Sequence, residues 1–149
     1  MEREAIQKVE RWMSDDGGDS HEEGFSKRAE LLCAILDDHH GNNRLRLTYI
    51  CTGLRCTMRS VEREFKTKYG ESMYKMQKRL RMERIEWYLR KDPEIKLSAL
   101  AVEMGYDRLS EFSRYFRKQK GMTPGQYLKT VIIPELAREE AEKDQSSDT

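Results

Sequence analysis

The chain has 149 residues, a net charge of +1 at pH 7 and a hydrophobic fraction of 37%. No apolar run approaches the ~20 residues that a membrane-spanning helix needs, and no signal-peptide core is present, so we expect no membrane partner. The three cysteines lack the spacing of a disulfide framework, which is typical of a reduced, cytosolic chain. Proline is scarce and no alternating strand pattern is present, so the composition favours an all-α protein.

The small net charge hides a separation of charge along the chain. Residues 1–24 carry a net charge of −5 and residues 135–149 one of −4, whereas residues 25–134 carry +10. We therefore predict an acidic leader over 1–24, one core domain over 25–134 and an acidic C-terminal helix and tail over 135–149. A core of this charge indicates a polyanionic partner. The alternative is that its Lys and Arg residues merely keep the chain in solution.

The leader predicts a short amphipathic helix followed by an acidic linker, and the first core helix follows at residues 25–40. Gly41 is expected to end this helix. His39 and His40 lie at the helix end, where a cationic side chain interacts favourably with the helix dipole. A metal site would need further Cys or His residues at recognised spacings, so we expect no metal.

A helix-turn-helix pattern follows over residues 47–70. In its second helix, Met58, Val61, Phe65 and Tyr69 share one face. The opposite face carries the candidate binding residues Arg59, Ser60, Arg63, Lys66 and Thr67. Residues 72–90 are free of Gly and Pro and predict one long linker helix, with Ser72 as its N-cap.

Residues 97–127 carry the clearest pattern of the chain. It comprises a short helix, a turn at Gly105, a second helix that stops at Gly121, and a third helix opened by Thr123 and Pro124. In the second helix, the apolar side chains Leu109, Phe112 and Phe116 share a face that can dock on the preceding helix. The polar residues on or beside the opposite face are Arg108, Ser110, Glu111, Arg114, Arg117 and Lys118.

The two patterns are copies of one repeat. Arg63–Gly70 matches Arg114–Gly121 at an offset of 51 positions, whereas the apolar positions upstream match at 50, so the first turn has lost one residue. Arg55 stands where the second copy has Gly105. A non-glycine residue in a left-handed turn costs roughly 1 kcal/mol, so we expect the first turn to be reshaped.

Cys51 and Cys56 lie on either side of the first turn, at positions that are apolar in the second copy. Core packing is the main interpretation of this pair, and a redox-sensitive thiol is the alternative.

The spacing of the apolar residues, the turn glycine, the Phe pair and the Thr-Pro restart together resemble the signature of the AraC/XylS family of bacterial transcription regulators. The resemblance implies an all-α fold of two helix-turn-helix units, about 25–71 and 91–134, joined by the linker helix at 72–90. It also implies that the two recognition helices enter successive major grooves on one DNA face, so that a monomer binds an asymmetric site. The polar residues of the two second helices are then the DNA-binding candidates.

Many members of that family carry a separate effector-binding or dimerisation domain. About 24 residues before the core are too few for such a domain, so we expect control without a small-molecule effector. No Gly-rich phosphate loop, Ser/His/Asp order or paired catalytic carboxylates can be identified, so we expect no enzyme and no cofactor.

The leading prediction is a sequence-specific, double-stranded DNA-binding transcription regulator in the bacterial cytoplasm, associated with the nucleoid. RNA polymerase or another regulator is a further candidate partner. The alternative is a protein-interaction module on the same scaffold. Glu62, Asp107 and Glu111 favour it, because acidic groups on or near DNA-facing helices repel phosphate.

Overall fold

The computed structural model describes residues 4, 7, 8 and 21–147, and this part of the chain is helical and contains no strand. The all-α class is therefore confirmed. Most of the predicted leader lies outside the described residues. The chain divides into two compact units, residues 1–81 and 82–149, and the division falls inside helix α5 (Met73–Lys91). None of the described helices is long and apolar enough to cross a membrane.

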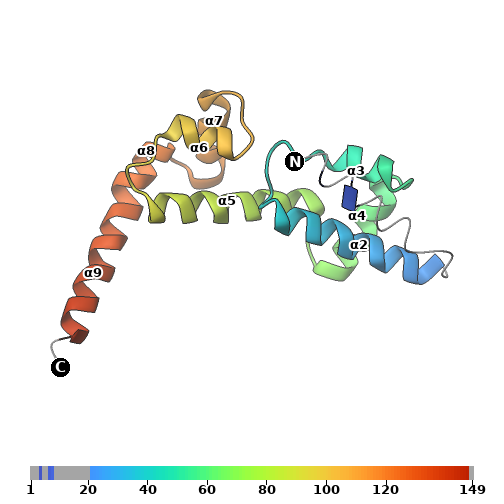
Figure 1. Cartoon of the computed structure of the whole chain (residues 1–149), viewed down its shortest axis with the longest axis horizontal. Coiled ribbons are helices and arrows are strands. Elements are labelled where there is room, and N and C mark those ends of the chain that lie inside the picture. The colour runs from blue at the N-terminus through green and yellow to red at the C-terminus, as the bar shows by residue number, and fades with distance from the viewer. Residues whose placement is uncertain (1–3, 5–6, 9–20, 148–149) are drawn as a thin grey trace. The chain divides into compact units, whose positions relative to one another are not determined.

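The first unit contains α2 (His21–Asp38), α3 (Leu47–Gly53), α4 (Met58–Tyr69) and the start of α5 (Figure 1). Helix α4 packs against both α2 and α3. The core of the first unit consists of one face of each helix, as the periodicity predicts. The side chains with no exposed surface include Leu32, Ile35, Leu36, Val61, Phe65 and Met73.

Helix α2 begins four residues earlier than predicted and ends two residues earlier. The last residues of the predicted acidic linker therefore belong to the helix, because acidic groups are favourable near a helix N-terminus. After the helix, His40 and Gly41 both have positive φ, at 52° and 63°. A Cβ atom on Gly41 would lie 2.0 Å from the carbonyl oxygen of Gln77, so this position requires glycine.

Two buried polar side chains of α5 hold the loop that follows α2. Gln77 donates from Nε2 to the carbonyl oxygens of Asn42 and Leu45, both at 3.0 Å. Arg81 donates from Nε to the carbonyl oxygen of Gly41 at 2.8 Å. Both side chains are about 5% exposed. Because unpaired polar groups are costly to bury, these bonds fix the loop on α5.

His39 does not supply the expected cation at the end of α2. Burial lowers the pKa of His39 below its usual value, so the imidazole is neutral at pH 7. Its Nε2 atom is buried and has no hydrogen-bond partner among the described residues.

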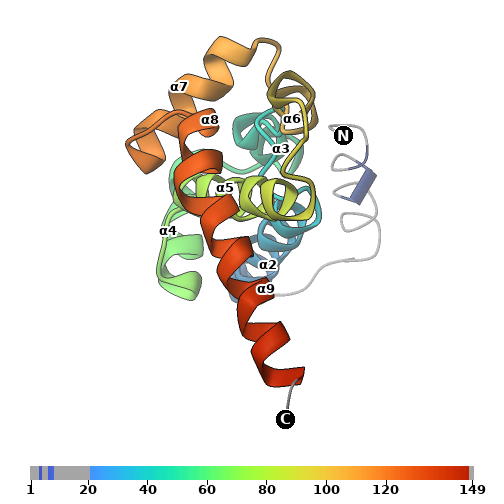
Figure 2. The same ribbon diagram turned by 90° about the vertical axis from the view of Figure 1, so that its left-hand side faces the viewer.

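The second unit contains the end of α5, α6 (Leu97–Glu103), α7 (Leu109–Lys120) and α8 (Pro124–Tyr127). A π-helical turn, η1 (Leu128–Ile132), then leads into α9 (Ile133–Ser147). The core of the unit comprises Ile85, Leu89, Leu100, Phe112, Phe116 and Ile132. Figure 2 shows that the final turns of α9 extend away from α6 and α7.

Leu109 does not join this core, in contrast to its predicted place beside Phe112 and Phe116. Its side chain is 43% exposed, whereas the two Phe side chains have no exposed surface. Leu109 is the first residue of α7, and helical side chains lean toward the N-terminus. Its side chain therefore leans beyond the end of the packed helix.

The predicted caps are confirmed. Ser72 Oγ accepts a hydrogen bond from the N–H of Lys75 at 3.1 Å, at the start of α5. Thr123 accepts from the N–H of Gln126, and the Gln126 side chain accepts in turn from the N–H of Thr123. This reciprocal pair is a capping box, with Pro124 in the first turn.

Candidate nucleic-acid interface

The two helix-turn-helix turns have the same backbone geometry. Arg55 has φ 56° and Gly105 has φ 90°, so both lie in the left-handed region. In each turn the next residue, Cys56 or Tyr106, donates its N–H to the carbonyl oxygen five positions earlier, over 3.1 and 2.9 Å respectively. The expected reshaping at Arg55 is wrong, because the arginine itself adopts the left-handed conformation. The missing residue is the counterpart of Asp107, just before the second helix.

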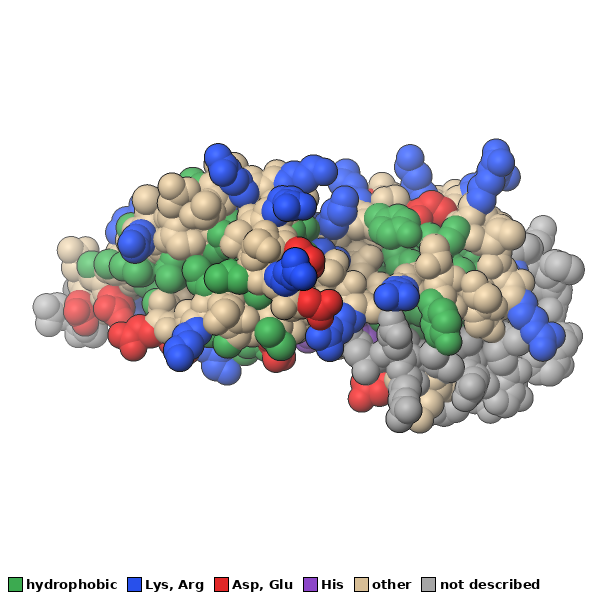
Figure 3. Space-filling view, turned by 90° about the horizontal axis from the view of Figure 1, so that it is seen from above, with side chains coloured by type: hydrophobic (Ala, Val, Ile, Leu, Met, Phe, Trp, Pro, Cys, Tyr) green, Lys and Arg blue, Asp and Glu red, His purple; other side chains and the backbone are tan. Residues whose placement is uncertain are grey.

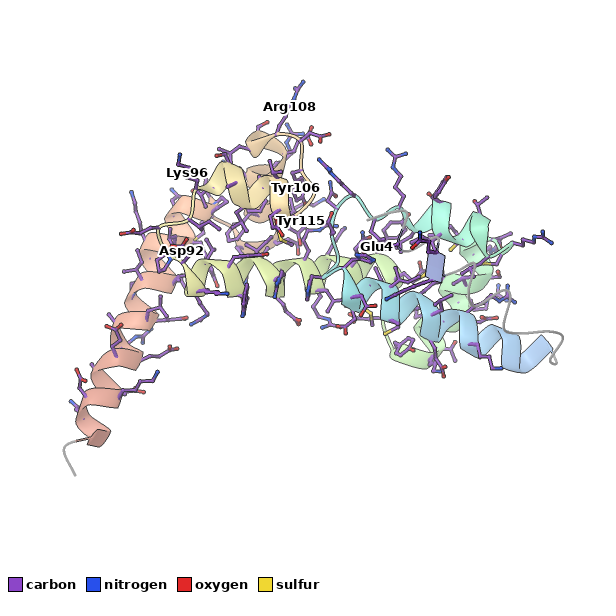
Figure 4. All side chains as sticks on the ribbon, viewed as in Figure 1. Glu4, Asp92, Lys96, Tyr106, Arg108 and Tyr115 are labelled. Atoms are coloured by element: carbon purple, nitrogen blue, oxygen red, sulfur yellow. The ribbon has the colours of Figure 1, made fainter. Side chains whose placement is uncertain are left out.

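These turns present the polar faces of α4 and α7 to solvent. On α4, the Arg and Lys candidates and Thr67 are exposed, whereas Ser60 is half-buried. On α7, all six candidates are exposed, and Arg108 points away from the ribbon at the start of the helix (Figure 4). The charged ends of the cationic candidates form no ion pair within the described part of the chain. These side chains are Arg59, Arg63, Lys66, Arg108, Arg114, Arg117 and Lys118.

Two hydroxyl candidates on α4 are already bonded to the helix backbone. The N-cap Thr57 accepts from the N–H of Ser60 at 3.2 Å, and the Ser60 hydroxyl donates to the carbonyl oxygen of Thr57 at 3.0 Å. Thr67 donates its hydroxyl to the carbonyl oxygen of Arg63 at 2.8 Å. Their protons are therefore committed, and each oxygen can still accept a hydrogen bond from a base or a side chain.

Neighbouring cations on the same helices are held by carboxylates of the protein. Lys68 pairs with Glu30 of α2. Lys120 lies 2.6 Å from Glu86 Oε1, and the Tyr127 hydroxyl donates to the same oxygen at 2.9 Å. These pairs distinguish lysines that stabilise a unit from those that remain available on its surface.

Glu62 does not belong to the polar face of α4. Its Oε1 atom accepts a hydrogen bond from the N–H of Met73 at 2.7 Å, at the start of α5. The carboxylate therefore serves the fold of the first unit. Asp107 and Glu111, the other two acids that favoured the protein-interaction alternative, are exposed.

A cationic pocket in the first unit was not predicted. It has a volume of about 290 Å³ and lies between the start of α3 and helix α5. Three Arg or Lys side chains and no acidic side chain line it. Lys78 and Arg81 come from α5, at helical spacing, and Arg46 is the N-cap residue of α3, so no local sequence pattern marks all three cations. The lining residues are Asn43, Leu45, Arg46, Leu47, Thr48, Tyr74, Gln77, Lys78 and Arg81.

Positive side chains dominate the surface on a larger scale too. On the face drawn in Figure 3, Lys and Arg side chains are plainly more abundant than Asp and Glu side chains over each unit taken by itself. This matches the positive charge of the core sequence and suits contact with a polyanion.

Solved structures share this fold. The C-terminal domain of AraT, a response regulator from Geobacillus stearothermophilus, is 26% identical with a TM-score of 0.60; the match covers 72% of this chain and 86% of that one. The C-terminal domain of the two-component response regulator yesN from Fusobacterium nucleatum is 22% identical with a TM-score of 0.58, covering 68% and 98%. A DNA-binding transcriptional dual regulator from Escherichia coli K-12 is 22% identical with a TM-score of 0.51, covering 66% and 86%.

No curated protein matches the chain in sequence. The family model described as "Helix-turn-helix domain" matches residues 50–130, which is more than half of the chain and includes both turns, α4 and α7. The sequence signature, the repeated turn geometry and this match agree. The chain belongs to the AraC/XylS family of helix-turn-helix transcription regulators.

Proposed function

We propose that the chain recognises a specific site on double-stranded DNA by placing α4 and α7 in major grooves. One observation carries the proposal: each helix buries aromatic side chains on one side, and on the other it presents Arg and Lys side chains that form no ion pair with any described residue. A helix fits the major groove, and cations left without a protein carboxylate are suited to phosphates and base edges.

The side chains of these faces suit different contacts. Arg63 and Arg114 lie in the middle of their faces, and an arginine fork can bind O6 and N7 of guanine together. Lys66 and Lys118 lie toward the helix ends, where a point charge suits a phosphate. Leu109, exposed at the start of α7, suits apolar contact with a thymine methyl group.

The pocket beside α3 supports a further phosphate contact. Its three cations and the absence of acidic groups in its lining match the charge of a backbone phosphate. Such a contact would fix the register of the first unit on DNA without reading bases.

We further propose that one chain binds one asymmetric site. Two non-identical recognition helices in one chain support this, because the exposed side chains of α4 and α7 differ. Helix α5 contributes residues to both units and connects them without a break. Recognition helices in adjacent major grooves would read DNA segments ~34 Å apart.

Selection of bound fragments from random DNA, followed by a gel shift at two salt concentrations and a footprint, tests the proposal. We expect one selected sequence, weaker binding at the higher salt concentration, and protection of about 20 bp on one DNA face. Arg138→Ala is the matched control, since Arg138 is an exposed arginine of α9 outside the proposed interface. A palindromic site that requires two chains, or protection of one half-site only, would reject the single-chain arrangement.

The second candidate function is a protein-interaction module that binds RNA polymerase or another regulator. The exposed Trp87 favours it: its ring is 41% exposed and lies 4.0 Å from the Arg84 guanidinium and 4.5 Å from the Lys91 ammonium group. Trp and Arg are enriched among residues that dominate protein interfaces. If no DNA is retained at either salt concentration, this function replaces DNA recognition.

A further inference from the structure

Two cysteines of the first unit meet across the turn between α3 and α4. Cys51 lies in the last turn of α3, and Cys56 donates its N–H to the carbonyl oxygen of Cys51 at 3.1 Å. The same carbonyl oxygen also accepts a hydrogen bond from the Cys56 thiol at 3.4 Å. This backbone bond is the one that brings together the side chains at the two ends of a Schellman turn. In the second unit the two positions hold Ala101 and Tyr106, so the thiol pair is a feature of the first unit alone.

The two thiols differ in exposure. Cys51 is 1% exposed, whereas Cys56 is half-buried and can be reached from solvent. An attacking reagent therefore meets Cys56 first, and Cys51 stands behind it. Both are free thiols in this structure.

Two neighbours of Cys56 lower the pKa of its thiol, against a hydrogen bond that the thiol donates to the Cys51 carbonyl oxygen. The hydrogen bond from the Cys51 thiol, with the Arg28 guanidinium of α2, lowers the pKa of Cys56 to about 7, although burial opposes this. The charge of Glu64 on α4 weakly raises the pKa of Cys56, and burial raises the pKa of Glu64 itself. The hydrogen bond to Cys56 and burial raise the pKa of Cys51, so the proton stays on the inner thiol. Thiolates, and not thiols, are the nucleophiles of cysteine chemistry.

We propose that Cys56 is a peroxide-reactive thiol and that Cys51 is its resolving partner, so that oxidation closes a Cys51–Cys56 disulfide in the turn before α4. The Cys56 sulfur attacks one oxygen of a hydroperoxide, so that an S–O bond forms and the O–O bond breaks. The leaving oxygen takes up the thiol proton, and the products are a sulfenic acid and water, or an alcohol from an organic peroxide.

Cys51 then completes the reaction. Its sulfur attacks the Cys56 sulfur, the S–S bond forms and the S–O bond breaks. The hydroxide that leaves takes the Cys51 proton and departs as water. Overall, the peroxide gains two electrons and the two thiols lose two. The product lies one residue before Thr57, the N-cap of α4, and so directly beside a recognition helix.

Alkylation of the full-length chain tests the reactivity of Cys56. The chain is treated with iodoacetamide over a range of pH, and the modified cysteines are quantified by peptide mapping. Cys33, a half-buried thiol of α2 that lies 3.9 Å from the sulfur of Met76, is the internal control. We expect Cys56 to react first, with a rate midpoint near pH 7 against about 8.5 for an ordinary thiol. Equal rates at Cys33 and Cys56 would overturn the proposal.

A matched pair of variants tests the role of Arg28 as a positioning residue. Arg28→Gln should slow alkylation of Cys56 at pH 7 severalfold and leave the alkylation rate of Cys33 unchanged. Arg28→Lys should retain most of the Cys56 rate of the parent chain. A thermal melt shows whether either variant still folds. An unchanged Cys56 rate in a folded Arg28→Gln variant would remove the electrostatic part of the argument.

Oxidation with hydrogen peroxide tests the resolving step. We expect a cross-linked peptide containing Cys51 and Cys56, lighter by two hydrogens and reversed by dithiothreitol. Cys51→Ser should instead stop at a sulfenic acid that dimedone traps on Cys56. A disulfide through Cys33, dimers linked between chains, or a sulfenic acid that persists beside an intact Cys51 would each overturn the proposal. None of these readouts requires DNA, so they are independent of the proposed DNA recognition.

Discussion

Glu62 and Met73 tie the recognition helix of the first unit to the start of α5. The Glu62 carboxylate accepts a hydrogen bond from the Met73 N–H at 2.7 Å, and Met73 has no exposed surface. A helix leaves its first N–H groups without partners inside the helix, and Glu62 satisfies one of them from a neighbouring element. An acidic residue on a helix that we propose faces DNA thus has a structural reason to be there.

Glu62→Ala should therefore lower the free energy of unfolding of the chain by about 1–3 kcal/mol, since the N–H of the buried Met73 loses its acceptor. Urea unfolding followed by circular dichroism measures this. Glu62→Gln is the control, because its amide oxygen can still accept the bond, and it should lose less than half as much. If the two variants were equally destabilised, the charge of Glu62 would matter more than its bond to Met73.

Gly41→Ala should be far more destabilising than Gly70→Ala. Both glycines have positive φ, at 63° and 77°, so both substitutions carry a similar backbone penalty of about 1 kcal/mol. A Cβ on Gly41 would also lie 2.0 Å from the carbonyl oxygen of Gln77, whereas a Cβ on Gly70 meets nothing within 4 Å. We expect losses of more than ~3 and about 1 kcal/mol respectively, measured by urea unfolding. Equal losses would mean that the loop after α2 can move away from α5.

Arg55→Gly should stabilise the chain by about 0.5–1 kcal/mol, because glycine adopts the left-handed conformation of the first turn without strain. The reciprocal change, Gly105→Arg, should cost at least as much in the second unit, where φ is 90°. Thermal unfolding of the two variants beside the parent chain measures both. A less stable Arg55→Gly variant would show that the arginine side chain makes a contact worth more than its backbone strain.

The stability of the second unit should fall at alkaline pH through Lys120, Glu86 and Tyr127. The hydrogen bond to Glu86 raises the pKa of Lys120, and burial together with Glu86 raises the pKa of Tyr127. Each folded pKa then exceeds the unfolded value, so the folded state holds more protons. This contribution is fully present below the unfolded values near pH ~10 and is lost as pH rises through the folded ones.

Glu86→Gln should flatten this pH dependence. Unfolding in urea between pH 8 and pH 11 measures it, and the parent chain should lose stability more steeply than the variant above pH ~10. Glu94→Gln is the matched control, since Glu94 is an exposed glutamate of the same unit. Parallel curves for the parent chain and Glu86→Gln would contradict the assignment.

The two kinds of cation on the proposed interface should be separable by salt. Arg63→Ala and Arg114→Ala should each lose about 1–3 kcal/mol of binding free energy and relax preference at particular bases. Lys66→Ala and Lys118→Ala should weaken binding to all DNA sequences alike and reduce the slope of log affinity against log salt concentration by about 1. Competition gel shifts at several salt concentrations, with Arg138→Ala as the control, distinguish these outcomes. A uniform loss in Arg114→Ala would move that residue to the phosphate contacts.

Local patterns determined most of the fold. Apolar spacing defined the buried faces of α4 and α7, and Ser72, Thr123 and Pro124 marked helix starts, because periodicity and caps depend on residues a few positions apart. The repeat revealed both helix-turn-helix units, and the family followed from it. The charge of the core indicated the class of partner.

Tertiary structure decided which individual side chains remain available. Glu62 bonds to Met73 and Lys120 pairs with Glu86, although each partner lies more than ten positions away in the sequence. Leu109 fits the apolar pattern of α7, yet it leans past the start of the helix into solvent. Periodicity gives the direction of a side chain around its own helix. Whether that side chain is buried or paired, and how Arg28 lowers the pKa of Cys56, depends on which residues the neighbouring helices place beside it.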